Sequence, residues 1–141
     1  MQHLLDPKSQ LASLRNIRRH LTPDGVFVFD VFDPKLVAIA VEEDPEILDA
    51  TFEYQGHEMQ RYATVVRDLS TQVMALTFRF EGENTDLVGS ARMHLRWYYR
   101  YEIEHLLARA GFTDATFFRD FARTPWSSGG EIVVVASRQA N

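Results

Sequence analysis

The stretch Thr22-Pro23-Asp24-Gly25-Val26-Phe27-Val28-Phe29-Asp30-Val31-Phe32 decides the fold class. Its first four residues are typical of a turn, because proline and glycine interrupt regular structure. The next seven residues are apolar at every position except Asp30. A short apolar run without alternation is typical of a strand covered on both faces, as in the sheets of α/β proteins. We therefore predict a buried strand over residues 26–32.

Helices are predicted on both sides of this strand. One covers residues 6–21, where Asp6 can act as N-cap and Pro7 suits the first helical position. Its apolar side chains recur every three to four residues; they are Leu11, Leu14, Ile17 and Leu21. A second helix over residues 101–110 shows the same spacing and precedes Gly111, which suits a left-handed helix C-terminus. Each helix thus has one apolar stripe for packing.

The hydrophobic period changes to two between residues 50 and 97. The alternating segments are 61–67, 74–80 and 91–97, with turns at 68–72 and 82–86. Alternation over short segments predicts an antiparallel meander of three or four strands with one solvated face. Residues 36–41 suggest a short helix before the meander, and the acidic stretch 42–45 closes that helix.

Two more strands are predicted at residues 115–121 and 131–137, joined by a loop that contains Gly129-Gly130. They can pair with the strand 26–32 on one side only, and only a helix precedes that strand in the sequence. Natural proteins avoid leaving a long apolar edge open. We therefore expect either that another chain covers this edge or that the sequence is the latter part of a larger domain.

Composition narrows the class of protein. The 141 residues are 45% hydrophobic and 25% charged, as in a globular domain. The net charge of −5 argues against a role in coating nucleic acid, and the absence of cysteine excludes thiolate metal sites and a cysteine nucleophile. No apolar run approaches the roughly 20 residues of a membrane span. The first residues lack a signal-peptide pattern, so we expect a cytoplasmic protein.

Two kinds of catalytic site are not supported by motifs. The five histidines show neither H-x-x-x-H nor H-E-x-x-H spacing, so no metal site is predicted. There is no G-x-S-x-G, the sequence signature of the α/β-hydrolase nucleophile.

Several stretches in order resemble class I S-adenosylmethionine (SAM)-dependent methyltransferases. Residues 4–21 followed by Pro23-Asp24-Gly25 and the strand 26–31 resemble the family's helix after the fourth strand, its L-x-P-G-G turn and its fifth strand. Residues 98–112 resemble the family's helix with the pattern y-x-x-x-E-L-x-x-L-L-x-x-A-G-F. The last two strands resemble the antiparallel sixth and seventh strands, and the meander resembles a β insertion carried by some members after the fifth strand.

This resemblance implies an α/β fold: a partial Rossmann-like methyltransferase sheet, with strands equivalent to five, six and seven and flanking helices, plus an inserted antiparallel β meander. Residues 1–49 and 98–141 would form the C-terminal part of the Rossmann-like domain. Residues 50–97 would form the insertion, acting as a lid or in dimerisation. The family's glycine-rich SAM motif has no counterpart, because the seven glycines include no G-x-G. The resemblance thus implies a C-terminal half without the N-terminal SAM-binding half, inactive alone.

The implied activity is methyl transfer from SAM, the implied cofactor, to a small-molecule acceptor. The loop after the family's fourth strand would bind the cofactor, and the end of the fifth strand and the exit of the insertion would bind the acceptor. No residue is assigned as catalytic base. The implied cofactor-binding residues are His3 and Leu4, and the implied substrate-binding residues are Phe32, Asp33, His94, Trp97 and Tyr98.

Two other functions stay open from the sequence. The chain could be a non-catalytic α+β module that forms a homodimer through the edge of strand 26–32 or through the β meander. It could also be a small-ligand-binding protein whose meander holds an apolar cavity walled by Tyr62, Phe78, Phe80 and Trp97. Neither nucleic acid nor membrane is an expected partner. The methyl acceptor is not named by the sequence.

Overall fold

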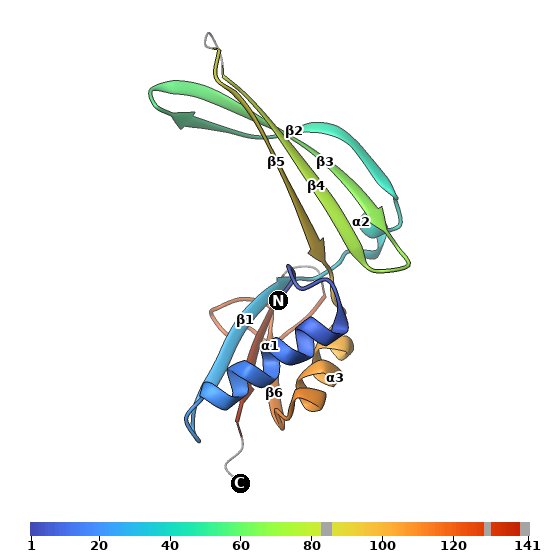
Figure 1. Cartoon of the computed structure of the whole chain (residues 1–141), viewed down its shortest axis with the longest axis vertical. Helices are drawn as coiled ribbons and strands as arrows, with labels where there is room; N and C mark the ends of the chain where they lie inside the picture. Colours follow the sequence, from blue (N-terminus) through green and yellow to red (C-terminus); the bar gives the residue numbers. More distant parts are fainter. Residues whose placement is uncertain (83–85, 129–130, 139–141) are drawn as a thin grey trace. The chain divides into compact units, whose positions relative to one another are not determined.

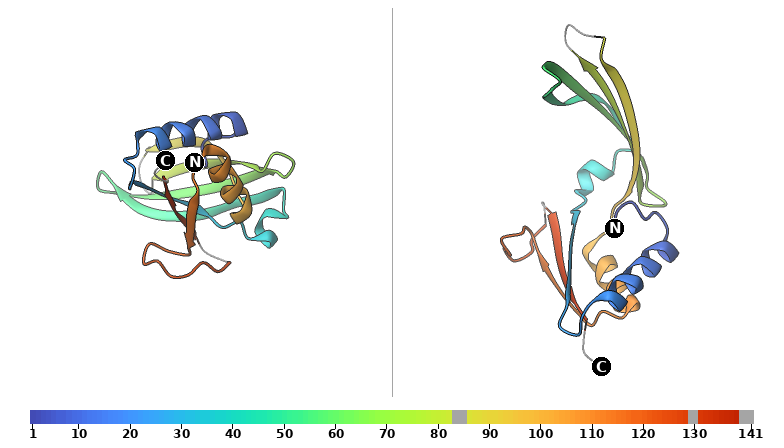
Figure 2. Two further views of the ribbon diagram at one scale, coloured as in Figure 1. Left: turned by 90° about the horizontal axis from the view of Figure 1, so that it is seen from below. Right: turned by 60° about the vertical axis from the view of Figure 1, so that its left-hand side comes forward.

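The computed structural model describes residues 1–82, 86–128 and 131–138 (Figures 1 and 2). It divides into two compact units, which are described one at a time. Unit 1 comprises Met1–Leu36 and Arg96–Asn141, and unit 2 comprises Val37–Leu95. Positions 83–85 of the predicted turn and the glycine pair 129–130 lie outside the described residues.

Unit 1 is a three-stranded antiparallel sheet with two helices. The elements are α1 (Pro7–His20), β1 (Val26–Phe32), α3 (Arg100–Ala110), β6 (Asp114–Phe118) and β7 (Glu131–Ser137). The strand order is β1-β7-β6, so β7 is central and β1 and β6 run in the same direction. The short helix α2 (Leu36–Ile39) connects to unit 2. The α/β class predicted from the sequence is confirmed.

Helix α1 begins as its sequence predicts. The Asp6 carboxylate accepts a hydrogen bond from the Ser9 amide at 2.9 Å, and Pro7 is the first helical residue. Hydrogen bonding from Ser9 holds the pKa of Asp6 below its usual value. The cap satisfies an amide that would otherwise lack a partner at the helix N-terminus.

Helix α3 ends at Gly111, whose φ of 96° is left-handed. A Cβ at this position would lie 3.2 Å from Arg18 Nε, which donates to the Gly111 carbonyl at 2.6 Å. Glycine is therefore required twice here, once for its backbone conformation and once for the close approach of Arg18. This contact ties the end of α3 to α1.

Both helices pack on the same face of the sheet, as Figure 2 shows. The register pairs Phe29 with Val134 and Val31 with Ile132, so these side chains share the face that the helices cover. The fully buried members of this core include Leu14, Tyr98, Leu107, Ile132 and Val134. Strand β7 is also buried on its other face, where Val133 is 2% exposed. The burial on both faces that was predicted for residues 26–32 is therefore found in β7.

The same prediction is wrong for β1. This strand is at the edge of the sheet, and among the described residues its only strand partner is β7. On the face away from the helices, Val26 and Val28 are 54% and 46% exposed, whereas Val31 on the covered face is 1% exposed. The apolar composition of a strand indicates that it suits burial, but the composition does not supply the elements that would bury it.

Unit 2 is an antiparallel meander, and its four strands confirm the predicted architecture. They are β2 (Glu43–Tyr54), β3 (His57–Asp68), β4 (Val73–Gly82) and β5 (Val88–Arg96), in the order β2-β3-β4-β5; the last residue of β5 belongs to unit 1. Strand β2 begins inside the acidic stretch predicted to close a helix, so that prediction is wrong. The β2–β3 register shifts twice between Asp44 and Ala50. Such bulges break the alternation that identifies a strand.

The meander has one apolar and one polar face. Pairing places Phe52 opposite Met59 and Ala63 opposite Phe78, all on the apolar face. Tyr62 pairs with Arg79 on the other face, and the Arg79 guanidinium lies 4.2 Å from the centre of the Tyr62 ring. Tyr62 and the two phenylalanines Phe78 and Phe80 therefore face opposite sides of the sheet. The predicted cavity walled by all three side chains does not form.

Candidate functional site

The carboxyl end of β1 is the candidate site in unit 1. Strand β1 ends at Phe32, which pairs with Glu131, and Asp33 follows it; both side chains are half-buried. Ligands of open α/β sheets bind beyond the carboxyl ends of the strands. The structure brings two further segments to this half of unit 1, namely residues 1–4 and the approach to α3 at residues 97–98.

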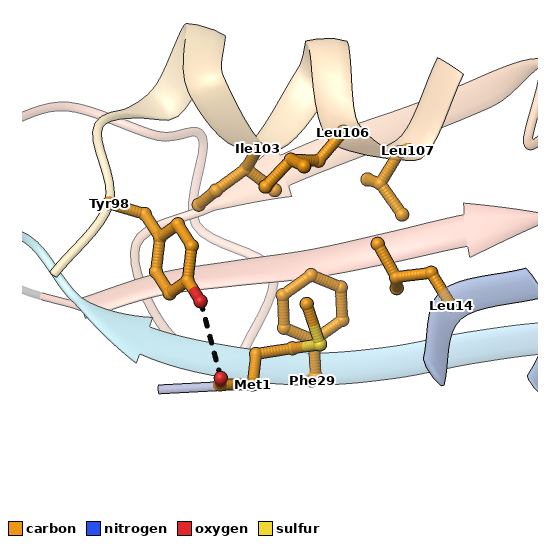
Figure 3. A pocket seen from close by; sticks show the side chains of 7 residues that line it. All are labelled: Met1, Leu14, Phe29, Tyr98, Ile103, Leu106 and Leu107. Carbon is orange, nitrogen blue, oxygen red and sulfur yellow. Dashed lines mark hydrogen bonds between the residues drawn. The ribbon is translucent and has the colours of Figure 1, made fainter. Parts of the chain in front are cut away.

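Tyr98 holds these two segments together. Its side chain is 1% exposed, and its hydroxyl donates to the carbonyls of Met1 at 3.2 Å and Leu4 at 3.3 Å. Burial raises the pKa of Tyr98 to about 12, so the phenol stays protonated at neutral pH and cannot act as a base. Figure 3 shows Tyr98 and Met1 joined in this way beside Phe29 of β1. The hydroxyl of this implied acceptor-binding residue is thus bonded to the protein's own backbone.

Residues 1–4 form a short turn. The Leu4 amide donates to the Met1 carbonyl at 3.0 Å, and the His3 side chain within the turn is exposed. Leu4 is half-buried, and its carbonyl accepts a hydrogen bond from Gln10 Nε2 at 2.7 Å. The structure therefore brings His3 and Leu4, the implied cofactor-binding residues, into one turn next to Tyr98. It leaves His3 available to a ligand.

Two residues that the sequence analysis did not single out complete this region. Gln10 is fully buried, and its Oε1 accepts from Arg96 Nη1 at 3.2 Å. Arg96 also donates through Nη2 to Glu102 Oε1 at 2.8 Å and through its backbone amide to the Gln2 carbonyl at 2.7 Å. One signal for Gln10 was present in the sequence, because it lies four residues before Leu14 on the apolar stripe of α1. A polar residue at such a position needs a buried partner.

The remaining implied residues are placed differently. Trp97 is 2% exposed and follows directly after β5. His94 lies on β5 in unit 2, where its side chain is exposed. Of the seven implied site residues, the structure connects Leu4 and Tyr98 by a hydrogen bond and places His3 in the same turn.

The cavities near this site are small. The one lined by Met1, Phe29 and Tyr98, among others, holds about 10 Å³, which is room for about one water molecule (Figure 3). A wider groove of about 440 Å³ is lined by side chains of α1 and α3 and by Arg96, with no side chain from β1, β6 or β7. Small-molecule pockets are usually 300–1,000 Å³ and largely enclosed. The described residues at the end of β1 thus do not enclose a pocket of the size that SAM requires.

The described part of the chain lacks the features of two other kinds of site. It contains no group of three or more histidine, aspartate or glutamate side chains arranged to hold a metal ion. None of its helices is long and apolar enough to cross a bilayer. Unit 2 carries a groove of about 270 Å³ on its apolar face, lined by side chains that include Phe52, Met59 and Phe80.

Comparison with solved structures identifies the fold. No family model and no curated protein matches the sequence. The chain is similar to the CcbJ methyltransferase from Streptomyces caelestis, with a TM-score of 0.75 and 20% identity over 99% of this chain and 53% of that one. A SAM-dependent methyltransferase from Clostridium acetobutylicum matches with a TM-score of 0.76 and 13% identity over 99% of this chain and 55% of that one.

A third similar structure is SAM-bound CalS10, an amino pentose methyltransferase from Micromonospora echinaspora. Its TM-score is 0.63 at 16% identity, over 95% of this chain and 52% of that one. This chain spans about half the length of each of the three proteins. Identities this low show the fold alone, and the chain therefore has the mixed α/β fold of part of a SAM-dependent methyltransferase.

Proposed function

We propose that this chain supplies the acceptor-side half of an enzyme that transfers a methyl group from SAM to a small molecule. The observation that carries the proposal is the match along 99% of the chain to two methyltransferases, with TM-scores of 0.75 and 0.76. The match includes the meander as well as the sheet, and only about half of each methyltransferase is covered. We therefore propose that another stretch of polypeptide provides the cofactor-binding half.

Methyl transfer depends chiefly on positioning, because the acceptor atom must approach the methyl group in line and out of water. In this proposal, Phe32 and Asp33 border the acceptor at the end of β1, and Trp97 and Tyr98 form part of the wall behind it. A role of His94 in acceptor binding stays a prediction. His3 and Leu4 would border the cofactor. Tyr98 acts through packing and through its hydrogen bonds to the backbone, since its phenol stays protonated at neutral pH and cannot act as a base.

The open edge of β1 supports the need for a second half. Every second residue of an edge strand directs its backbone N–H and C=O away from the sheet. On the uncovered face of β1, Val26 and Val28 stay largely exposed. A further strand at this edge, with helices over the uncovered face, would satisfy both features. We propose that the cofactor-binding half occupies this position and contributes the pocket for SAM that the described residues lack.

An amino sugar is the acceptor that we propose. The support is that one of the similar structures is an amino pentose methyltransferase. An amine of this kind carries a proton at neutral pH that must leave before or during transfer, so a base would assist the reaction. Two side chains in this part of unit 1 could accept this proton, namely His3 and Asp33. The His3 side chain is exposed.

Isothermal titration calorimetry with SAM tests the division into halves. We expect no saturable heat from this chain alone at millimolar SAM, because the described residues enclose no pocket for it. Micromolar binding by the chain alone would contradict the need for a second half. The positive test is a chimera in which this chain follows the part of the Clostridium methyltransferase that it does not match. SAM binding by the folded chimera is expected, and its absence would contradict the acceptor-side assignment.

A second candidate function is a homodimerisation module without catalysis. The observation that favours it is again the exposed apolar edge of β1, which could pair with its equivalent across a two-fold axis. The apolar face of the meander is an alternative dimer surface, and its groove is also the place where a small apolar ligand would bind. Light scattering coupled to gel filtration tests for the dimer, and a stable dimer together with a chimera that binds no SAM would favour the module over the first proposal.

A further inference from the structure

We infer that Gln10, Arg96 and Tyr98 are positioning residues that hold the turn at residues 1–4 in one conformation at the edge of the candidate site. These three residues are referred to as the clamp. The inference rests on the proposed function for its catalytic meaning, because the turn carries His3. The hydrogen bonds that hold the turn all lie within unit 1.

The three clamp residues donate hydrogen bonds to backbone carbonyls of the turn. Gln10 Nε2 donates to the Leu4 carbonyl at 2.7 Å, and the Arg96 amide donates to the Gln2 carbonyl at 2.7 Å. The Tyr98 hydroxyl donates to the carbonyls of Met1 and Leu4 at 3.2 and 3.3 Å. Three of the four carbonyls of the turn are thus bonded to residues that are distant in sequence. A turn held by so many tertiary hydrogen bonds has little freedom to rearrange.

The clamp is itself rigidly held. Gln10 is fully buried, and both ends of its amide are used, one by Leu4 and the other by Arg96. The Arg96 side chain is 12% exposed, pairs with Glu102 of α3 at 2.8 Å and lies 5.5 Å from the centre of the Tyr98 ring. Hydrogen bonds within a buried polar network strengthen one another, so such a network favours one arrangement of its members.

The position of Gln10 on α1 indicates that the network fixes the position of the turn at residues 1–4. Gln10 lies on the stripe of α1 that carries Leu14, where an apolar side chain would pack without any cost of burying an amide. Such a side chain could not hold the Leu4 carbonyl. A residue that exchanges simple packing for two specific hydrogen bonds fixes where the turn lies.

The consequence for function is preorganisation. The His3 side chain is exposed while the backbone on both sides of it is bonded. A binding group on an already ordered turn loses less backbone conformational entropy when its ligand arrives. The clamp therefore serves ligand binding through His3, and none of its three members needs to touch the ligand.

Amide hydrogen exchange measured by NMR tests the clamp without any ligand. In Tyr98→Phe, we expect the Leu4 amide to exchange about five- to tenfold faster, because one hydroxyl of the clamp is lost. The amide of Leu107, in the buried part of α3, should keep its rate. Tyr101→Phe is the matched control, because it removes the hydroxyl of an exposed tyrosine, three residues further along the chain in α3. Equal acceleration at Leu4 and Leu107 would overturn the inference, since the hydroxyl would then serve general stability.

A second pair of variants isolates the donor of Gln10. Gln10→Glu keeps an acceptor for Arg96 but cannot donate from its carboxylate to the Leu4 carbonyl, whereas Gln10→Asn keeps the donor on a shorter stem. We expect faster Leu4 exchange in Gln10→Glu, and partial protection in Gln10→Asn. Wild-type exchange in Gln10→Glu would show that the donor is not needed and would contradict the inference.

The wild-type chain provides a test that needs no variant. We expect backbone order parameters near 0.85 for Gln2 and His3, the value of rigid backbone, and values below about 0.6 would overturn the inference. None of these measurements uses SAM. A mobile turn would therefore leave the proposed function open, and a failure of the chimera to bind SAM would leave the clamp intact.

Discussion

The Tyr98 hydroxyl lies 3.3 Å from the carbonyl oxygen of Leu4, although the two residues are 94 positions apart in the chain. This hydrogen bond connects the turn before α1 to the approach of α3. It places the two segments of unit 1 that the methyltransferase resemblance implies in ligand binding next to each other. It also uses the phenol for positioning, since a hydroxyl whose pKa is about 12 does not accept protons at neutral pH.

Loss of this hydroxyl is expected to reduce stability modestly. Tyr98→Phe keeps the buried ring but removes the donor to Met1 and Leu4, so the free energy of unfolding should fall by about 1 kcal/mol. Urea denaturation measures this change, with the slope of the transition unaltered. Tyr101→Phe, at a side chain that is 66% exposed, should change the free energy by less than about 0.5 kcal/mol. Equal effects of the two variants would contradict the buried hydrogen bond.

The end of α3 should not tolerate a side chain at Gly111. Gly111→Ala introduces a Cβ in a left-handed conformation, at 3.2 Å from Arg18 Nε, and should cost about 1–2 kcal/mol of unfolding free energy. Gly56→Ala is the control, because Gly56 has a φ of 79° with no atom within 4 Å of the added Cβ. Thermal denaturation of both variants separates the conformational cost from the contact. A loss at Gly111 no larger than the loss at Gly56 would show that Arg18 moves away freely.

The two faces of β1 should respond differently to truncation. Val31 is 1% exposed beneath the helices, so Val31→Ala should cost about 2 kcal/mol of unfolding free energy. Val28 is 46% exposed on the uncovered face, so Val28→Ala should cost under about 1 kcal/mol in this chain. Urea titrations compare the two variants. A cost at Val28 as large as at Val31 would mean that the outer face is covered in solution, and gel filtration would then show whether a second copy covers it.

The β3–β4 turn should contribute a dependence of stability on pH. Hydrogen bonds from Ser70 and Thr71 lower the pKa of Asp68 to about 2 from an ordinary value of 3.8. A carboxyl whose folded pKa is depressed stabilises the fold above its unfolded pKa and loses that contribution as the pH falls through the folded value. The stability difference between wild type and Asp68→Asn should therefore be full above pH 4 and decline towards pH 2. Melting temperatures of both proteins across this range provide the measurement, and a constant difference would contradict the shift.

His3 should matter for ligand binding and not for folding. Its side chain is exposed and the clamp bonds only the backbone around it, so His3→Ala should shift the urea midpoint little. In the chimera with a cofactor-binding half, the same variant should weaken binding of SAM or of an amino sugar, as titration calorimetry measures. Lys8→Ala, on the exposed side of α1, is a control of similar exposure. Unchanged binding by the His3 variant would remove this residue from the proposed site.

Local sequence patterns predicted most elements because each signal lies within a few residues of its effect. Asp6 caps the helix that it precedes, Gly111 ends the helix that it follows, and the apolar run at 132–135 is the central buried strand β7. The start of β2 escaped prediction because its bulges remove the alternation of a strand. The sequence predicts one cavity for Tyr62 and Phe78 because alternation alone does not show which residues pair across strands. The observed register puts the two side chains on opposite faces of the sheet.

The sequence by itself determined the α/β class, the meander and the resemblance to a methyltransferase, because helix caps, turns and hydrophobic periods act over short distances along the chain. Only the tertiary structure decided which face of β1 the helices cover and which apolar face, that of Val26 and Val28, they leave exposed, since burial depends on which elements are present to provide it. It also decided that Gln10, Arg96 and Tyr98 converge on residues 1–4. Buried hydrogen bonds of this kind join residues up to 97 positions apart, and no local pattern encodes which buried donor reaches which carbonyl.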